Sequence, residues 1–183
     1  MTRTMPALLG GTPVRTQPFP PHTTMLGAEE RAAVLAVLDG GELEGLEPLR
    51  APVVEPRCTH TYYVYGMTFD GAAAGLSRAT LAAALRAEGF PVGEGYTTPL
   101  YLQPLYQQRL AYTRGCPFTC GHYDGAVSYA PGLCPVTERL SDADLLITEI
   151  CKYPNRPEDM RDFGRALRKV VEHGPALEQA ARR

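Results

Sequence analysis

The run from residue 99 to residue 135 is the strongest constraint on how this chain can fold. Its prolines, glycines and tyrosines follow neither the helical nor the strand period. The folded core must therefore come from the segments on either side of the run. Irregular runs of this length inside compact domains are usually functional or bound to a partner. We expect this region to hold the site.

The segment before the run predicts a strand and then a helix. From Thr59 onward, aromatic and β-branched residues alternate with the period of a strand, most clearly over residues 62–69. Ser77 can cap a helix over residues 78–88 that ends at Gly89, and Phe90 is placed to contact Leu85. Residues 92–96 predict a short strand returning along the first, which completes a strand, helix, strand unit.

The segment after the run predicts two helices and one ambiguous element. Residues 134–140 predict a short helix, and residues 145–150 fit a strand or a helix on pattern alone. Pro157, two acidic residues after it and an apolar stripe up to Val171 predict a longer helix that ends before Gly174. Residues 176–183 are expected to be a frayed tail.

The chain divides into four parts on these patterns. Residues 1–45 predict an extended arm and one helix over residues 27–38, with an apolar stripe at Val34, Val37 and Leu38. Residues 46–57 hold three prolines and predict a linker. Residues 58–175 form the folded domain, and residues 176–183 form the tail. The order of elements indicates an α+β fold.

Composition excludes several classes of function. The 183 residues carry a formal charge of −2, and the arginines are scattered, so no nucleic-acid surface is indicated. No signal peptide or membrane-spanning run is evident, so we expect a cytoplasmic protein with no membrane partner. Five cysteines, an odd number, fit reduced thiols better than a disulfide framework.

Two blocks of the sequence resemble the DegT/DnrJ/StrS family of sugar and aminocyclitol aminotransferases, which use pyridoxal phosphate (PLP). The first block runs from Gly10 to Leu43. The second starts near Leu46 and includes Gly95-Tyr-Thr-Thr-Pro-Leu-Tyr-Leu-Gln-Pro-Leu-Tyr106 and Leu146-Ile-Thr-Glu-Ile-Cys151. The large cofactor-binding domain of the family is absent between about Glu42 and Leu46. The resemblance therefore implies an internally deleted relative with the aminotransferase small-domain fold, a small antiparallel or mixed sheet with packed helices, and it favours a strand at residues 145–150.

The chemistry of this family needs a lysine that holds PLP as a Schiff base. The chain has only Lys152 and Lys169, and the Ser-x-x-Lys pattern of the family is missing. Lysines are mostly exposed in proteins, so both are expected to be solvated surface residues. We therefore predict no catalytic residue and no cofactor for the chain alone, with PLP present only if a partner chain supplies the binding domain.

The resemblance also implies candidate residues for binding a keto sugar or keto cyclitol. In relatives, the stretch matching Tyr96 to Tyr106 reads His-Tyr-x-Pro-x-His-x-Gln-Pro and lies near the sugar cleft; here Tyr96, Thr97 and Tyr101 replace its distinctive positions. We predict Tyr96, Tyr101 and His122 as substrate-binding residues. Core packing is the favoured explanation for Tyr101, because aromatic residues dominate cores. A structural role is the expectation for His60.

A second pattern, Cys116-x3-Cys120-x-His122 with Cys134 downstream, offers soft ligands for zinc. It is not a Cys-x2-Cys knuckle, so no metal site is predicted. A Cys and His nucleophilic pair oriented by Asp124 is a weaker alternative.

Three functions stay open on the sequence alone. The chain can be an accessory or pseudoenzyme subunit in amino-sugar or aminocyclitol biosynthesis, which self-associates or binds a full-length aminotransferase homologue. It can instead be one half of a split PLP-dependent transaminase. It can also be a relic without activity.

Overall fold

The computed structural model describes residues 4–18, 46–109, 115–123, 125, 127–152 and 154–182. Both lysines and the three predicted substrate-binding residues are among them. The helix expected over residues 27–38 lies outside the described residues, as does Asp124.

A four-stranded antiparallel sheet with the order β1-β2-β4-β3 forms the centre of the fold. Its strands are β1 (Leu49–Arg50), β2 (Tyr65–Phe69), β3 (Val92–Glu94) and β4 (Leu145–Thr148). Tyr65 pairs with Thr148, and Val92 pairs with the same residue from the other side. The strand interpretation of residues 145–150 is therefore confirmed, as is the α+β class.

Alternate residues of β2 face the core, as the sequence pattern predicted. Tyr65, Met67 and Phe69 are buried, whereas the residues between them are only half-buried. The strand is shorter than the pattern that predicted it, because Tyr62 has a positive φ of 49°. That left-handed backbone breaks the extended run, and the ladder begins only at Tyr65.

Helix α3 (Arg78–Ala87) has the predicted caps at both ends. The Ser77 hydroxyl accepts a hydrogen bond from the Thr80 N–H at the start. At the end, Gly89 has a φ of 97° and the Phe90 N–H donates to the Leu85 carbonyl at 3.0 Å. This is the Schellman arrangement, and it carries the Phe90 side chain into the core, where it is 1% exposed.

Two expectations about the sheet are wrong. The strand β3 does not lie beside β2, because β4 pairs with both and separates them. The linker expected over residues 46–57 contains the edge strand β1, whose Leu49 pairs with Phe69 of β2. Pro48 supports this pairing, since its carbonyl accepts a hydrogen bond from the Asp70 N–H.

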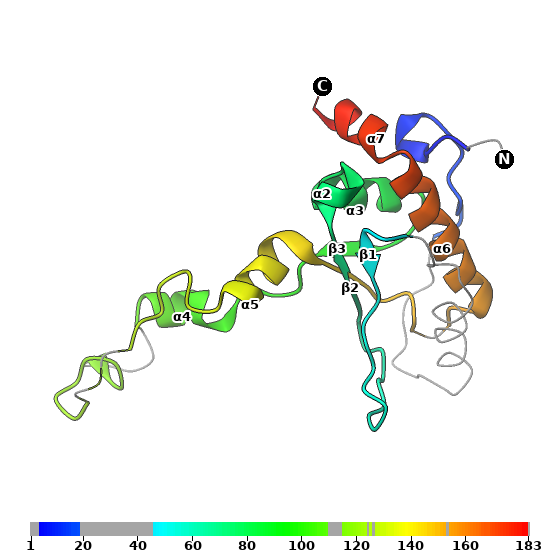
Figure 1. The fold of residues 1–183 in the computed structure, drawn as a ribbon. Coiled ribbons are helices and arrows are strands. Elements are labelled where there is room, and N and C mark those ends of the chain that lie inside the picture. Colours follow the sequence, from blue (N-terminus) through cyan, green and yellow to red (C-terminus); the bar gives the residue numbers. More distant parts are fainter. Residues whose placement is uncertain are drawn as a thin grey trace.

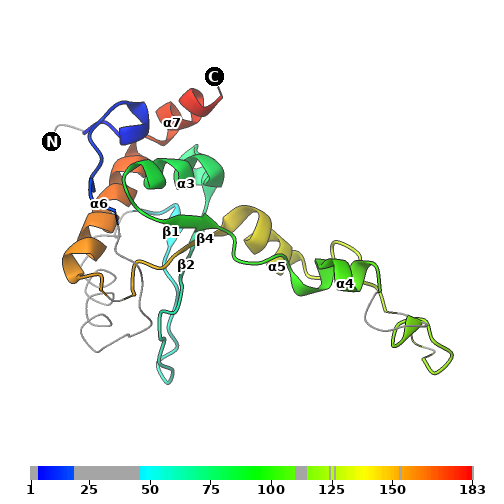
Figure 2. The same cartoon turned by 180° about the vertical axis from the view of Figure 1, so that it is seen from behind.

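Helices pack over the sheet on the side of Tyr65 and Met67 (Figures 1 and 2). Helix α6 (Pro157–Glu172) is the long helix that the sequence predicted, with Pro157 in its first turn. The expected frayed tail is instead helix α7 (Gly174–Ala181), whose Leu177 is fully buried. Burying that one apolar side chain against the core orders the end of the chain. Two short helices, α2 (Gly71–Ala74) and a 3₁₀ turn (Ala7–Leu9), complete this layer.

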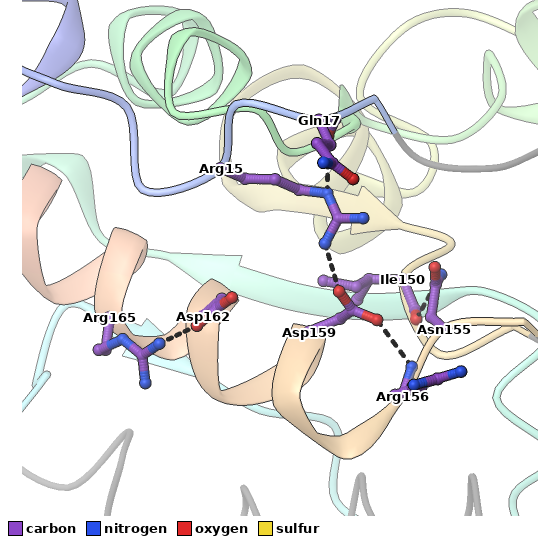
Figure 3. A network of polar contacts seen from close by, with 8 residues as sticks. All are labelled: Arg15, Gln17, Ile150, Asn155, Arg156, Asp159, Asp162 and Arg165. Carbon is purple, nitrogen blue, oxygen red and sulfur yellow. Dashed lines mark hydrogen bonds and ion pairs between the residues drawn. The ribbon is translucent and has the colours of Figure 1, made fainter.

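The N-terminal segment over residues 4–18 lies on α3 and α6 and is held there by charged side chains. Arg15 forms an ion pair with Asp159, which also accepts a hydrogen bond from the Arg156 N–H at 2.8 Å at the start of α6 (Figure 3). Figure 3 also shows Asn155 donating to the Ile150 carbonyl, which fixes the loop before the helix. Residues 4–18 of the expected extended arm are thus held against the folded domain of the same chain.

A long projection leaves the sheet after β3 and returns before β4. It contains a 3₁₀ turn (Leu100–Leu102), α4 (Pro104–Gln107) and α5 (Pro135–Arg139), followed by a π-helical turn (Leu140–Asp144). The helix predicted over residues 134–140 is confirmed as α5. Figures 1 and 2 show this projection pointing away from the sheet and the helices that cover it. We call the described residues between 96 and 139 the projecting arm. None of the described helices is both long enough and apolar enough to cross a membrane.

Candidate functional site

Hydrogen bonds and ring contacts hold the described residues of the projecting arm together. The Tyr101 hydroxyl donates to the Glu138 carboxylate, which also accepts a hydrogen bond from the Gly132 N–H at 2.6 Å. The Gln107 amide donates to the Tyr101 and Tyr129 carbonyls, at 2.8 and 2.6 Å. The outgoing and returning halves of the arm are therefore joined by side chains.

A cleft of about 810 Å³ lies at the root of the arm, between β1, the starts of α2 and α3, and the turn after α5. Acidic and basic side chains line it, but most of them already form hydrogen bonds or ion pairs within the fold. The Arg78 guanidinium donates to the Ser141 and Asp142 carbonyls, both at 2.8 Å. Arg139 pairs with Asp144 at 2.9 Å. This cleft is a braced junction between the arm and the core.

A smaller groove of about 430 Å³ lies on the sheet face opposite the main core. Val64, Gly93 and Ile147 form its floor, and Tyr96 lines it with a side chain that is 58% exposed. Arg86 borders the groove; its Nε donates to the Val92 carbonyl at 2.8 Å. The groove has an apolar floor and polar edges, which suits a ring with hydroxyl groups.

The three predicted substrate-binding residues do not come together in one cleft. Tyr96 lines the sheet groove, whereas Tyr101 is bound to Glu138 in the arm. His122 is exposed and belongs to residues 115–123, the yellow-green segment at the far end of the arm in Figure 1. Their role in binding a sugar stays a prediction, and Tyr96 is the one placed in a groove.

The expectation that both lysines are solvated is wrong. Lys152 is 7% exposed; its Nζ lies 2.6 Å from the Glu149 carboxylate and 4.4 Å from the centre of the Tyr63 ring. The Lys169 side chain is 9% exposed, and its Nζ lies 2.9 Å from the Glu88 carboxylate. Each ammonium is buried because it has a carboxylate partner within the fold.

These positions do not fit a Schiff-base lysine for PLP. The Nζ of Lys169 also donates to the Thr12 carbonyl at 2.7 Å, beneath the N-terminal segment. Neither lysine lines the root cleft or the sheet groove. A lysine that captures an aldehyde needs an amine that faces the cavity holding it, and neither amine faces the root cleft or the sheet groove.

Glu88 is an important residue that the sequence patterns did not single out. It is fully buried, and its carboxylate accepts hydrogen bonds from the Ala7 N–H at 2.6 Å and the Val14 N–H at 2.9 Å. With Lys169, it fastens the N-terminal segment to α3 and α6. The sequence did contain a signal for its burial. Residue 88 follows Leu81 and Leu85 at helical spacing, so it continues the buried face of α3.

The start of α3 is already occupied by a carboxylate of the chain itself. Glu178 of α7 accepts a hydrogen bond from the Ser77 N–H at 2.9 Å. That bond, together with bonds from the Thr80 and Ser77 hydroxyls, lowers the pKa of Glu178 from 4.5 to about 2. A helix start of this kind would suit a phosphate group, but here it binds α7.

Replacing Glu178 should remove a pH-dependent part of the stability. A carboxylate with a lowered pKa stabilises the fold above its ordinary value of 4.5, and this contribution disappears as the pH falls through about 2. The Glu178→Gln variant should therefore be less stable than the parent at pH 7 and should lose less stability on acidification. Urea unfolding followed at several pH values measures this. Glu172→Gln, at an exposed position of α6, is the control. The assignment would be contradicted if the unfolding free energies of the parent and of Glu178→Gln depended on pH in the same way.

His60 has a structural role, and the described candidate metal ligands do not form a group of three or more. The Nδ1 atom of His60 accepts a hydrogen bond from the Tyr62 N–H at 2.8 Å, and its ring stacks on Tyr62, which agrees with the expected structural role. Among the described residues, no three Cys, His, Asp or Glu side chains are grouped to hold a metal ion.

Comparisons with known proteins show a likeness of fold. No family model matches the sequence, and no curated protein matches it. The structure resembles the crystal structure of DesI in the presence of its TDP-sugar product, with a TM-score of 0.58 and 18% sequence identity. The match covers 85% of this chain and 33% of the DesI chain, so this chain spans about a third of the length of that protein.

Proposed function

We propose that this chain is a non-catalytic accessory subunit that binds an intact aminotransferase of the DegT/DnrJ/StrS type. One observation carries the proposal: the fold holds both lysine amines against carboxylates, at 2.6 Å for Lys152 and 2.9 Å for Lys169. Such a chain would keep the fold of an aminotransferase small domain. Its two lysine amines would stabilise that fold through ion pairs and would not react with PLP.

The projecting arm supplies the binding surface in this proposal. Seven of the eleven large apolar side chains that are exposed among the described residues belong to the arm. Leu100 is 69% exposed, Val136 is 62% exposed and Leu133 is 53% exposed. Apolar side chains gathered on one projection are typical of an interaction site.

The partner is inferred from the part of the aminotransferase chain that this protein does not match. The likeness to DesI extends over only a third of the DesI chain, and the sequence resemblance omits the large domain of the family. A protein that contains such a domain would offer the surface on which a small domain packs. We therefore choose an intact aminotransferase of the resembled family as partner, acting on a keto sugar or keto cyclitol.

A second candidate function is favoured by the position of Tyr96. Its exposed side chain lines the sheet groove beside the root of the arm, where a phenol can stack on or hydrogen-bond a polyol. In a split transaminase, a second polypeptide would supply the lysine and PLP, and this groove would complete the site. Amino transfer that requires both chains would support this function over the accessory role.

Replacing apolar residues of the arm should weaken binding to the partner while leaving the fold intact. We expect the Leu133→Ser/Val136→Ser variant to bind an intact aminotransferase of the family at least about tenfold more weakly, since central apolar contacts contribute more than about 1 kcal/mol each. Its free energy of unfolding should change little, because both side chains are exposed. Size-exclusion chromatography with light scattering and calorimetric titration follow the complex, and urea unfolding measures the stability.

Val53→Ser is the matched control, because Val53 is 88% exposed but lies outside the arm. It should bind as the parent does. Equal loss of binding in both variants would contradict a role for the arm. Association of the chain only with itself would contradict the choice of partner.

A further inference from the structure

The five cysteines occupy three different environments. Cys58 and Cys134 are exposed, Cys116 and Cys120 are half-buried, and Cys151 is buried. Burial raises the pKa of the Cys151 thiol to about 12. A thiol that stays protonated is a poor nucleophile, so Cys151 serves as an internal unreactive reference.

Cys116 and Cys120 are brought together by a tight turn. The Thr119 N–H donates to the Gly115 carbonyl at 2.7 Å, which places the two cysteines one turn apart. Gly115 has a φ of 76°, and a Cβ at this position would collide with the Thr119 hydroxyl, so the turn requires glycine. This spacing brings the two side chains near enough for each thiol to shift the pKa of the other.

Aromatic side chains hold this turn on the arm. The Phe118 ring, between the two cysteines, meets the Tyr129 ring edge-on at 5.8 Å. Tyr129 in turn packs on Tyr106 of α4 at 5.3 Å. The pair of thiols therefore sits on a supported turn at the far end of the arm.

The two thiols differ in pKa. The interaction with the Cys116 thiol, together with backbone N–H groups around His122, lowers the pKa of Cys120. The same interaction raises the pKa of Cys116. Such an asymmetry gives one attacking thiolate and one thiol that can resolve the product.

We propose that Cys116 and Cys120 form a redox-active dithiol that reacts with low-molecular-weight disulfides. The Cys120 thiolate attacks one sulfur of the oxidant; the S–S bond of the oxidant breaks, a mixed disulfide forms on Cys120, and one thiolate leaves. Cys116 then loses its proton and attacks the Cys120 sulfur, which releases the second thiolate and forms the Cys116–Cys120 bond. Two electrons pass to the oxidant, which becomes two thiols.

The experiment treats the fully reduced protein with glutathione disulfide, blocks free thiols with an alkylating agent and maps the peptides by mass spectrometry. A peptide over residues 115–139 contains Cys116, Cys120 and Cys134. We expect it to lose two hydrogen atoms and to carry the alkyl group on Cys134 alone. A bond to Cys134, or a mixed disulfide that persists in the parent protein, would overturn the proposal.

Single variants test each thiol in its role. Cys116→Ala should leave a stable glutathione adduct on Cys120 and should slow alkylation of Cys120 at neutral pH, because the interaction with Cys116 that lowers the pKa of Cys120 is gone. Cys120→Ala should leave no internal disulfide. Cys58→Ala and Cys134→Ala are the controls and should form the Cys116–Cys120 bond at the parent rate. Faster reaction at Cys58 or Cys134 than at Cys120 in the parent would also refute the proposal.

Discussion

The Lys169→Met variant should lose about 3–5 kcal/mol of unfolding free energy, the largest effect on stability that we expect from a single change. Glu88 is fully buried, and the Lys169 Nζ lies 2.9 Å from its carboxylate. Removing the ammonium leaves a buried charge whose remaining partners among the described residues are the Ala7 and Val14 N–H groups. Urea unfolding measures the loss.

Exchange of the Ala7 and Val14 amide hydrogens gives a second readout, because the N-terminal segment should open first. Both amides should exchange faster in Lys169→Met, since the carboxylate that accepts their hydrogen bonds becomes costly to keep buried. Arg161→Met is the control: its partner Glu158 lies at 3.3 Å and both side chains are at least half exposed. That pair should contribute less than about 1 kcal/mol.

Neutralising Glu88 and Lys169 together separates the effect of the unpaired charge from the effect of the lost side-chain packing. The double variant Glu88→Gln/Lys169→Met removes the unpaired charge and keeps one oxygen that can accept one of the two backbone hydrogen bonds, from Ala7 or from Val14. It should be more stable than Lys169→Met alone. A loss below about 1 kcal/mol in Lys169→Met, or no recovery in the double variant, would show that the pair does not fasten the segment.

Local patterns in the sequence predicted the elements of the core well. The alternation around Met67 and the caps of α3 at Ser77 and Gly89 depend on near neighbours, and the structure has them as expected. The helix from Pro157 follows for the same reason. These features need no knowledge of distant contacts.

The errors arose where distant parts of the chain decide the outcome. Leu177 orders α7 only because a core is present to bury it. Leu49 becomes a strand because β2 offers it a free edge. Lys169 is buried because it pairs with Glu88, 81 residues away, and no local pattern shows that pairing. Lys152 pairs with Glu149 at a spacing that the sequence shows, but the burial of that pair depends on the fold around it.

The candidate site was the least predictable part. The irregular run after Pro99 indicated a special region, but the spacing of its residues could not show that Tyr101 binds Glu138 while Tyr96 stays exposed. The resemblance grouped Tyr96, Tyr101 and His122 by their place in the family pattern. In this fold, the projecting arm spreads them along its length.

The chain on its own should take up no PLP as a Schiff base. Both amines are bound to carboxylates and are at most 9% exposed, so an aldehyde would have to break an ion pair and enter the fold to reach either one. We expect no aldimine absorbance when PLP is added in equal amount to the purified protein. Lys152→Ala should behave as the parent does in this assay.

The most direct measurement is reduction with borohydride after the addition of PLP, followed by peptide mapping of Lys152 and Lys169. Our account predicts that the peptides holding these lysines stay unmodified, in the presence or absence of the partner aminotransferase. A stoichiometric phosphopyridoxyl group on either lysine would contradict it.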